Sequence, residues 1–288
     1  MPNKDDAVIV FFNTNAWLDL HSYVSAQLYH NLRALIVFFC VGQGGGNGGY
    51  GSYVTVPEVQ LCVKLPTNLP PEIGCMLPCS ALTAYNAIKT ALPTLELGIR
   101  MRGVANLLVV GCGGVGAWVT VILKRLMCYQ IIKVVCADTN KEKLDAAATL
   151  GADDVIQWNK SDDVDVLVNN TTVSGYNKID AVVDFVGSSQ TVDIGVKCLH
   201  KGGCLVLVGL AGGEYTVSLP LVVSNSISIQ GVRCGSLVQF KELVDLFVVQ
   251  QCETFPPVET ISLEAINDAL DRLRKGEVKG RAVIKYSH

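Results

Sequence analysis

Two hydrophobic patterns alternate along the chain from residue 99 onward. Short, continuously apolar runs are followed by stretches in which apolar residues recur every three or four positions. The first pattern is typical of a strand that is buried on both faces, and the second is typical of a helix that covers one face of a sheet. The repeated order of strand and helix indicates a parallel sheet with helices on both sides. We therefore predict a doubly wound α/β domain over residues 99–234.

The predicted elements of this region follow one another closely. Strands are expected at residues 106–110, 131–137, 154–157, 179–186, 204–210 and 226–232. Helices are expected at residues 115–128, 141–150, 190–199 and 238–250, with a weaker helical pattern after residue 157.

The first 98 residues carry a weaker pattern. Residues 1–41 show no clear helical or strand period. Residues 42–51 contain seven glycines in ten positions, which predicts a loop. The pattern of residues 71–92 predicts two short helices that meet at Pro78, because proline interrupts a helix.

Short strand patterns flank the predicted doubly wound domain. Alternating runs at residues 53–56 and 60–65 each end at a proline, as edge strands do. Residues 257–286 have the order strand, helix, strand, and we expect this segment to pack back on the N-terminal part. We therefore predict that residues 1–98 and 235–288 together form a second domain.

The composition favours a folded chain with a large core. Half of the 288 residues are hydrophobic, 17% are charged, and the mean hydropathy is +0.37, which excludes extended disorder. The formal net charge is −3 and no block of Lys and Arg occurs, so we expect no nucleic-acid partner. The apolar runs are shorter than the roughly 20 residues of a membrane-spanning helix, so we expect no membrane association.

The cysteines and the first residues bear on the compartment. The chain has eleven cysteines, an odd number, and no C-x-x-C motif, so a disulfide framework is not expected. The start Met-Pro-Asn-Lys-Asp-Asp differs from the basic region of a secretory signal. We therefore predict a cytoplasmic protein.

A glycine motif follows the first strand of the doubly wound region. Gly111, Gly113 and Gly116 fit G-x-G-x-x-G, directly after an apolar strand and directly before a helix. In this context the first glycine allows a tight turn, the second lets the backbone approach a pyrophosphate, and the third lets the helix pack on the strand. The helix N-terminus favours bound phosphate through its free N–H groups and its dipole.

Asp138 lies at the tip of the next predicted strand. A carboxylate at this point of a doubly wound fold hydrogen-bonds the ribose diol of NAD and repels the 2′-phosphate of NADP. The alternative is a glycine-rich turn with an incidental aspartate. The context favours NAD as cofactor.

Four segments resemble a known family. They are Gly49-Tyr-x-x-Tyr-Val-x-Val-Pro57, Leu77-Pro-Cys-Ser-x-x-Thr-x-Tyr85, Val110-Gly-Cys-Gly-Gly-Val-Gly116 and Gly280-Arg-Ala-Val283. Together they are similar to the zinc-dependent medium-chain alcohol dehydrogenases, and most of all to the bacterial-type, propanol-preferring branch. The resemblance implies a Rossmann domain over residues 99–234 and a GroES-like, β-rich catalytic domain over residues 1–98 and 235–288, here truncated, with residues 1–41 unmatched.

The resemblance also implies individual cofactor contacts. The pyrophosphate would lie against Gly111, Gly113, Gly114, Val115, Gly116 and Arg281. The adenosine half would contact Asp138, Lys143, Phe185 and Val186. The nicotinamide half would contact Thr83, Val208, Gly209, Leu210, Cys234, Gly235 and Ser236.

The catalytic zinc of the family has one matching ligand in this chain. Cys79 matches the third protein ligand, whereas the family's N-terminal Cys motif and its Gly-His-Glu have no counterpart. Cys40 is the only cysteine before the glycine loop, so the four-cysteine structural zinc site is missing too. A catalytic zinc needs about three protein ligands. Cys79 is therefore either a metal ligand, as the family implies, or a buried free thiol.

These observations give one functional hypothesis and two alternatives. The first is an NAD-dependent dehydrogenase that transfers hydride between a small alcohol and NAD, giving an aldehyde or ketone, with turnover impaired by the missing zinc ligands. The alternatives are an NAD-binding pseudoenzyme or fragment without turnover, and a zinc-free enzyme similar to quinone reductases. The apolar strand pattern at residues 226–232 also allows a homo-oligomer.

Overall fold

Two compact units make up the protein. The computed structural model describes residues 9–11, 26–28, 35–37, 62–66, 69–159, 161–173 and 179–285. One unit comprises Thr83–Cys234, and the other comprises Met1–Leu82 together with Gly235–His288.

The glycine-rich stretch at 42–51 and the strand pattern at 53–56 lie outside the described residues. The domain boundary expected between residues 98 and 99 lies inside helix α2 (Leu82–Arg102) in the structure. The proposed domain division therefore stays a prediction.

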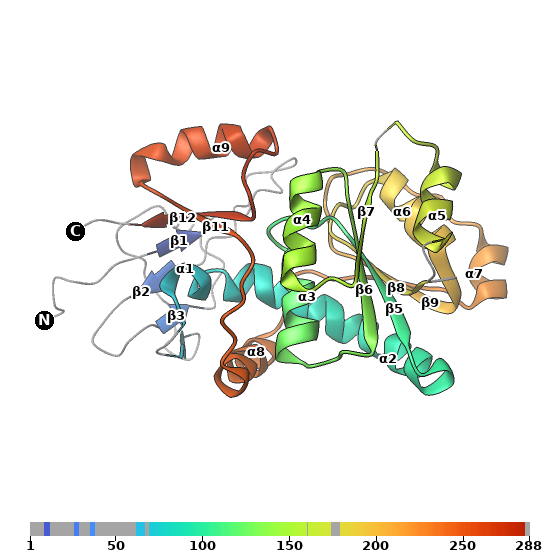
Figure 1. Cartoon of the computed structure of the whole chain (residues 1–288), viewed down its shortest axis with the longest axis horizontal. Helices are drawn as coiled ribbons and strands as arrows, with labels where there is room; N and C mark the ends of the chain where they lie inside the picture. The colour runs from blue at the N-terminus through green and yellow to red at the C-terminus, as the bar shows by residue number, and fades with distance from the viewer. Residues whose placement is uncertain are drawn as a thin grey trace, which may run out of the picture. The chain divides into compact units, whose positions relative to one another are not determined.

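The unit Thr83–Cys234 is a parallel sheet with helices on both faces (Figure 1). Its strand order is β10-β9-β8-β5-β6-β7, and all neighbouring strands run parallel. The chain enters at β5, moves outward through β6 and β7, and crosses to β8 on the other side of β5. This order confirms the predicted doubly wound fold. The strands are β5 (Ala105–Val110), β6 (Ile132–Asp138), β7 (Asp154–Gln157), β8 (Ile179–Asp184), β9 (Leu199–Leu207) and β10 (Ser228–Gly231).

Helices α3 and α4 lie on one side of this sheet, and α5 and α6 lie on the other (Figure 1). The start of α4 shows how the sequence fixes such a helix: the Asn140 side chain accepts hydrogen bonds from the N–H groups of Glu142 and Lys143, at 2.8 and 3.4 Å. The helices are α3 (Ala117–Val121), the π-helical turn η4 (Ile122–Leu126), α4 (Lys141–Leu150), α5 (Val164–Val173), α6 (Ser189–Cys198) and α7 (Leu219–Asn225).

Several predicted boundaries differ from the structure. The helix expected at 115–128 begins at Ala117, because the residues before it form the glycine turn, and it ends in η4. Strand β9 begins at Leu199 instead of Cys204 and pairs with β8 across an irregularity. Glycines 202 and 203 lie inside this strand, and their low β propensity explains why the pattern did not extend to Leu199.

Helix α7 was not predicted. It begins with Leu219 and Pro220, and none of its residues is buried. A helix without a buried stripe has no apolar period to detect.

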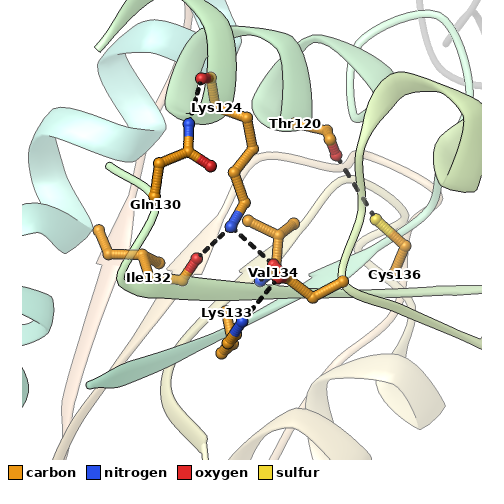
Figure 2. A network of polar contacts seen from close by, with 8 residues as sticks. Thr120, Lys124, Gln130, Ile132, Lys133, Val134 and Cys136 are labelled. Atoms are coloured by element: carbon orange, nitrogen blue, oxygen red, sulfur yellow. Dashed lines mark hydrogen bonds and ion pairs between the residues drawn. The ribbon is translucent and has the colours of Figure 1, made fainter. Parts of the chain in front are cut away.

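A buried lysine joins η4 to strand β6 (Figure 2) and pairs with Asp153, which directly precedes β7. Lys124 Nζ donates to the carbonyl of Ile132 at 2.6 Å and lies 2.7 Å from Asp153 Oδ2. Asp153 also accepts hydrogen bonds from Lys133 Nζ at 3.0 Å and from the N–H of Val134 at 2.8 Å. Burial alone raises the pKa of Asp153, but these donors outweigh it and hold the pKa below its ordinary value. The paired charges explain how a lysine is accommodated at a buried position.

The second unit contains a mixed sheet built from both ends of the chain. Its strand order is β11-β12-β1-β2-β3-β4, and β1 pairs antiparallel with β12. A strand of the C-terminal segment thus pairs with a strand from the start of the chain. The strands are β1 (Ile9–Phe11), β2 (Ala26–Leu28), β3 (Leu35–Val37), β4 (Cys62–Lys64), β11 (Val258–Ile261) and β12 (Arg281–Lys285).

The helical segment around Pro78 is more continuous than expected. Helix α1 (Pro71–Gly74) is followed by the π-helical turn η3 (Leu77–Ala81), which contains Pro78 and leads directly into α2. Proline is tolerated there because it lies in the first turn, where its missing N–H has no helical partner to lose. The remaining helices of this unit are α8 (Leu237–Gln250), the 3-10 turn η5 (Leu263–Ala265) and α9 (Ile266–Arg274).

A membrane-spanning helix requires length and apolar composition together. Within the described ranges, no helix combines the two.

Candidate dinucleotide-binding site

The glycine turn after β5 has the geometry that its motif predicts. Gly111 has a φ of +88°, which favours glycine, and its N–H donates to the carbonyl of Ala137 at 2.8 Å. A Cβ on Gly116 would collide with the carbonyl oxygen of Gly111. The first and third glycines are therefore required by the turn itself.

Gly113 differs from these two glycines because a Cβ placed on it would meet nothing within 4 Å. Its carbonyl accepts the N–H of Ala117 at 3.0 Å, so the residue also begins the helical hydrogen-bonding of α3. Gly113, Gly114 and Val115 are half-buried, whereas Gly111 and Gly116 are buried. The structure thus leaves open space at the glycine where a pyrophosphate would approach the backbone.

Asp138 lies at the end of β6, next to this turn. Its Oδ2 accepts the N–H of Cys112 at 2.8 Å, and its Oδ1 accepts the N–H of Asn140 at 2.9 Å. A carboxylate has about four lone-pair positions, so two N–H donors leave acceptor capacity for ribose hydroxyls. Lys143 lies in the first turn of α4, and its N–H donates to Asn140 Oδ1 at 3.4 Å. The structure therefore brings Asp138 to the glycine turn and places Lys143 at the start of the helix that follows β6.

The segment after β8 packs directly on the glycine turn. The N–H of Phe185 donates to the carbonyl of Val110 at 2.8 Å. A Cβ on Gly111 would lie 2.9 Å from Val186 Cγ2, and one on Gly116 would lie 3.2 Å from Phe185 Cδ2. Because β5 and β8 are the neighbours between which the chain reverses its direction of winding, this contact lies at the switch point where such sheets bind ligands.

The segment after β9 completes this edge of the sheet. The N–H groups of Val208 and Gly209 both donate to the carbonyl of Asp184, each at 2.9 Å. The structure therefore gathers Phe185, Val186, Val208 and Gly209 with the glycine turn at the carboxyl ends of the strands, and Leu210 follows with an exposed side chain.

The remaining predicted contacts are divided between the two units. Thr83 and Cys234 belong to the unit of the parallel sheet, where Asn86 Nδ2 donates to the carbonyl of Cys234 at 2.7 Å. Gly235, Ser236 and Arg281 belong to the other unit. The contacts of all five residues with the cofactor stay predictions.

Cys79 lies in η3 with its side chain buried, next to a buried arginine. Arg281, the first residue of β12, is buried near Cys79 and Cys75. Burial lowers the pKa of Arg281, and a negative charge on either sulfur would oppose this shift. Burial, reinforced by the charge of Glu72, raises the pKa of Cys75.

The described residues do not fit a catalytic zinc. Among them, no group of three or more His, Cys, Asp or Glu side chains is placed to hold a metal ion. Among the described residues, Arg281 lies near Cys79, and its guanidinium is itself a cation. His21, His30 and Cys40, the other candidates of the N-terminal segment, lie outside the described residues.

Asp184, the last residue of β8, was not among the predicted site residues. Its side chain is fully buried and accepts hydrogen bonds from the N–H groups of Val186 and Gly187 and from the hydroxyl of Thr191. Burial raises the pKa of this carboxyl, and the three donors oppose the shift. An acidic residue at the end of an apolar strand, three positions before a glycine, was the available signal.

Comparison with known proteins agrees with this geometry. Residues 114–248 match the zinc-binding dehydrogenase family. The chain is 35% identical over 244 residues to an NAD-dependent alcohol dehydrogenase of Sulfolobus acidocaldarius, covering 84% of this chain and 65% of that protein. An NAD-dependent alcohol dehydrogenase of Saccharolobus solfataricus is 31% identical over 240 residues, covering 83% and 64%. The crystal structure of the Aeropyrum pernix alcohol dehydrogenase matches with a TM-score of 0.79 at 25% identity, covering 97% of this chain and 92% of that one.

A doubly wound sheet with this glycine turn and an acidic residue after its second strand defines a dinucleotide-binding domain. Together with the similarities, it relates the chain to the zinc-type medium-chain alcohol dehydrogenases. The chain spans about 65% of the length of the two archaeal relatives. Its assignment to the propanol-preferring branch and its N-terminal truncation stay predictions.

Proposed function

We propose that the chain binds NAD(H) at the carboxyl edge of the parallel sheet and acts in hydride transfer between a small alcohol and its aldehyde or ketone. The single observation that carries NAD binding is the glycine turn, with open space at Gly113 and the carboxylate of Asp138 beside it. The two archaeal relatives named NAD-dependent alcohol dehydrogenases support the same cofactor and substrate class. When bound, NAD supplies the hydride acceptor.

The residues of the site would divide the work of binding. The backbone at Gly113 and the N-terminus of α3 would hold the pyrophosphate, with Gly114 and Val115 lining its path. Asp138, fixed by its two N–H donors, would accept the hydroxyls of the adenosine ribose. The segments that follow β8 and β9 would carry the rest of the cofactor, and Thr83, Cys234, Gly235, Ser236 and Arg281 are proposed as further contacts.

Replacement of Asp138 tests the choice of cofactor. We expect the wild-type chain to bind NADH more tightly than NADPH, because the carboxylate opposes the 2′-phosphate. Asp138→Asn keeps the shape of the side chain and one carbonyl acceptor but removes the charge. The ratio of the Kd for NADPH to the Kd for NADH should therefore fall by about tenfold, equivalent to about 1.4 kcal/mol. Fluorescence titration with both cofactors measures the change. Tighter binding of NADPH by the wild-type chain would contradict this role of Asp138.

A pseudoenzyme that binds NAD without turnover is the second candidate function. It is favoured by the observation that the described residues provide Cys79 but no group able to hold zinc. The two candidates share cofactor binding and differ in turnover, so activity measurements on the same preparation separate them.

We further propose that the chain forms a homo-oligomer through strand β10. This strand is at the edge of the sheet, all four of its residues are exposed, and the preceding α7 exposes Leu219 and Val223 by 73% and 76%. An unpaired strand edge flanked by apolar side chains favours pairing with another chain. Light scattering should give a mass above the 30.9 kDa of one chain. Ile229→Lys should reduce the mass to that of the monomer, whereas the control Val166→Glu, at another exposed apolar residue, should not. A monomeric wild-type chain would contradict the proposal.

A further inference from the structure

Asp184 connects the two segments that follow β8 and β9. Its Oδ1 accepts the N–H groups of Val186 and Gly187, at 2.7 and 2.9 Å, so the side chain curls the segment after β8 back on itself. Its backbone carbonyl accepts the N–H groups of Val208 and Gly209, at 2.9 Å each, which fixes the start of the segment after β9. One fully buried residue therefore provides acceptors to both segments.

The two segments also pack closely on each other. A Cβ on Gly187 would collide with the backbone of Gly209, and a Cβ on Gly209 would collide with the backbone of Val186. The N–H of Ala211 donates to the carbonyl of Val186 at 3.0 Å. Such close backbone contact means that a displacement of one segment must displace the other.

The second carboxylate oxygen of Asp184 reaches the next helix. Oδ2 accepts the hydroxyl of Thr191 at 2.7 Å. Thr191 and Ser188 form the reciprocal cap at the start of α6, and Ser188 forms a parallel bridge with Gly212. The carboxylate thus holds the segment after β8 at both of its ends.

We infer that Asp184 is a positioning residue that sets the place of Phe185–Gly187 and Val208–Leu210 against the glycine turn and thereby sets the affinity for the dinucleotide. The inference rests on the proposed NAD binding at this edge. Asp184 acts through the backbone of these segments, and in particular through Val186, which lies against Gly111. Without its carboxylate, two partly buried N–H groups lose their acceptor and the segments lose their fixed place.

The hydrogen-bond geometry distinguishes a positional role from a role of the charge. In Asp184→Asn the amide oxygen can accept from Val186 and Gly187, and the amide nitrogen can donate to Thr191 Oγ1. The Thr191 hydroxyl can then donate to the carbonyl of Ser188, which lies 3.1 Å away. The asparagine variant can therefore keep the hydrogen bonds from Val186 and Gly187, reverse the one with Thr191 and lose the charge, whereas Asp184→Ala loses all three.

Asp180 offers a matched control on the same strand. It is also buried, it lies four residues earlier on the same face of β8, and its carboxylate accepts the N–H of Asn106 at 2.8 Å and pairs with Arg102. Its position near the start of the strand places it away from both segments. Asp180→Ala therefore removes a comparable buried carboxylate and its hydrogen bonds without touching the candidate site.

The experiment compares the full-length wild type, Asp184→Ala, Asp184→Asn and Asp180→Ala. NADH titration by fluorescence should give a Kd at least about tenfold higher for Asp184→Ala, and within about threefold of wild type for the other two variants. Hydrogen exchange should show faster exchange of the Val186 and Gly187 amides in Asp184→Ala alone. Urea unfolding should show a lower free energy of unfolding for both Asp184→Ala and Asp180→Ala. A purely structural role of the two carboxylates predicts this loss equally for both variants.

The outcomes separate the inference from the function on which it rests. Equal NADH affinities for wild type and Asp184→Ala, or an equal loss in Asp180→Ala, would overturn the inference. A tenfold loss in Asp184→Asn would also overturn it and point to the charge instead. A wild-type chain that does not bind NADH would overturn the proposed function, and the exchange of the two amides would then still decide whether Asp184 holds the segment.

Discussion

Gly113→Val is expected to abolish NADH binding while the protein stays folded. A Cβ at this position meets nothing within 4 Å in the structure, and Gly113 is not among the residues with positive φ, so the backbone accepts a valine. The new side chain would fill the space through which a pyrophosphate reaches the backbone. We expect the Kd for NADH to rise by about 100-fold or more, equivalent to about 2.7 kcal/mol.

Two further variants make this result specific. Gly231 also has open space around its Cβ and no positive φ, so Gly231→Val is a matched control that should leave the affinity unchanged. Gly116→Ala should instead destabilise the domain, because its Cβ collides with the carbonyl of Gly111. If folded Gly113→Val binds NADH as tightly as wild type, the glycine turn has only a structural role.

The second large effect concerns turnover. The chain is expected to form NADH from ethanol or 2-propanol at a rate lower by about 1,000-fold or more than the roughly 10 s⁻¹ of a typical enzyme. Hydride leaves an alcohol readily only when the hydroxyl proton leaves too, and in this family a Lewis-acidic zinc makes that possible near neutral pH. The sequence supplies Cys79 but neither of the family's other two ligand motifs. Removing several kcal/mol of stabilisation lowers the rate by orders of magnitude, since each 1.4 kcal/mol is about tenfold.

Zinc content and NADH formation should be measured on one preparation, together with Cys79→Ala. If the prediction holds, the variant and the wild type share the same residual rate. One zinc per chain with ordinary turnover, both lost in Cys79→Ala, would contradict it. Such a result would mean that two further ligands, with His21, His30 and Cys40 as the candidates, complete a metal site with Cys79.

The parallel sheet and its glycine turn were predictable because their signals are local. The helix at 141–150 and the strand at 154–157 have the predicted boundaries, since apolar periodicity, the Asn140 cap and the closing glycine all lie within one short stretch. Gly111 and Gly116 were predicted for the same reason: the turn and the close helix packing follow from a motif of six residues.

The elements that were missed depend on distant partners. Strands β1, β2 and β3 have three residues each, and a pattern that short carries no measurable period. Strand β1 pairs with β12 from the other end of the chain, which the sequence of either segment alone does not indicate. The role of Asp184 was hidden similarly, because most of the acceptors it provides are used by backbone N–H groups, which every residue type except proline has.

The close contact between Gly187 and Gly209 restricts how this chain can evolve. Each glycine is required by backbone atoms of the opposite segment and not by a side chain. A mutation elsewhere can shrink a side chain to make room, but it cannot shrink a carbonyl group. Neither glycine therefore has an obvious second-site suppressor, and a lineage that loses one of them must rebuild both segments to recover the site.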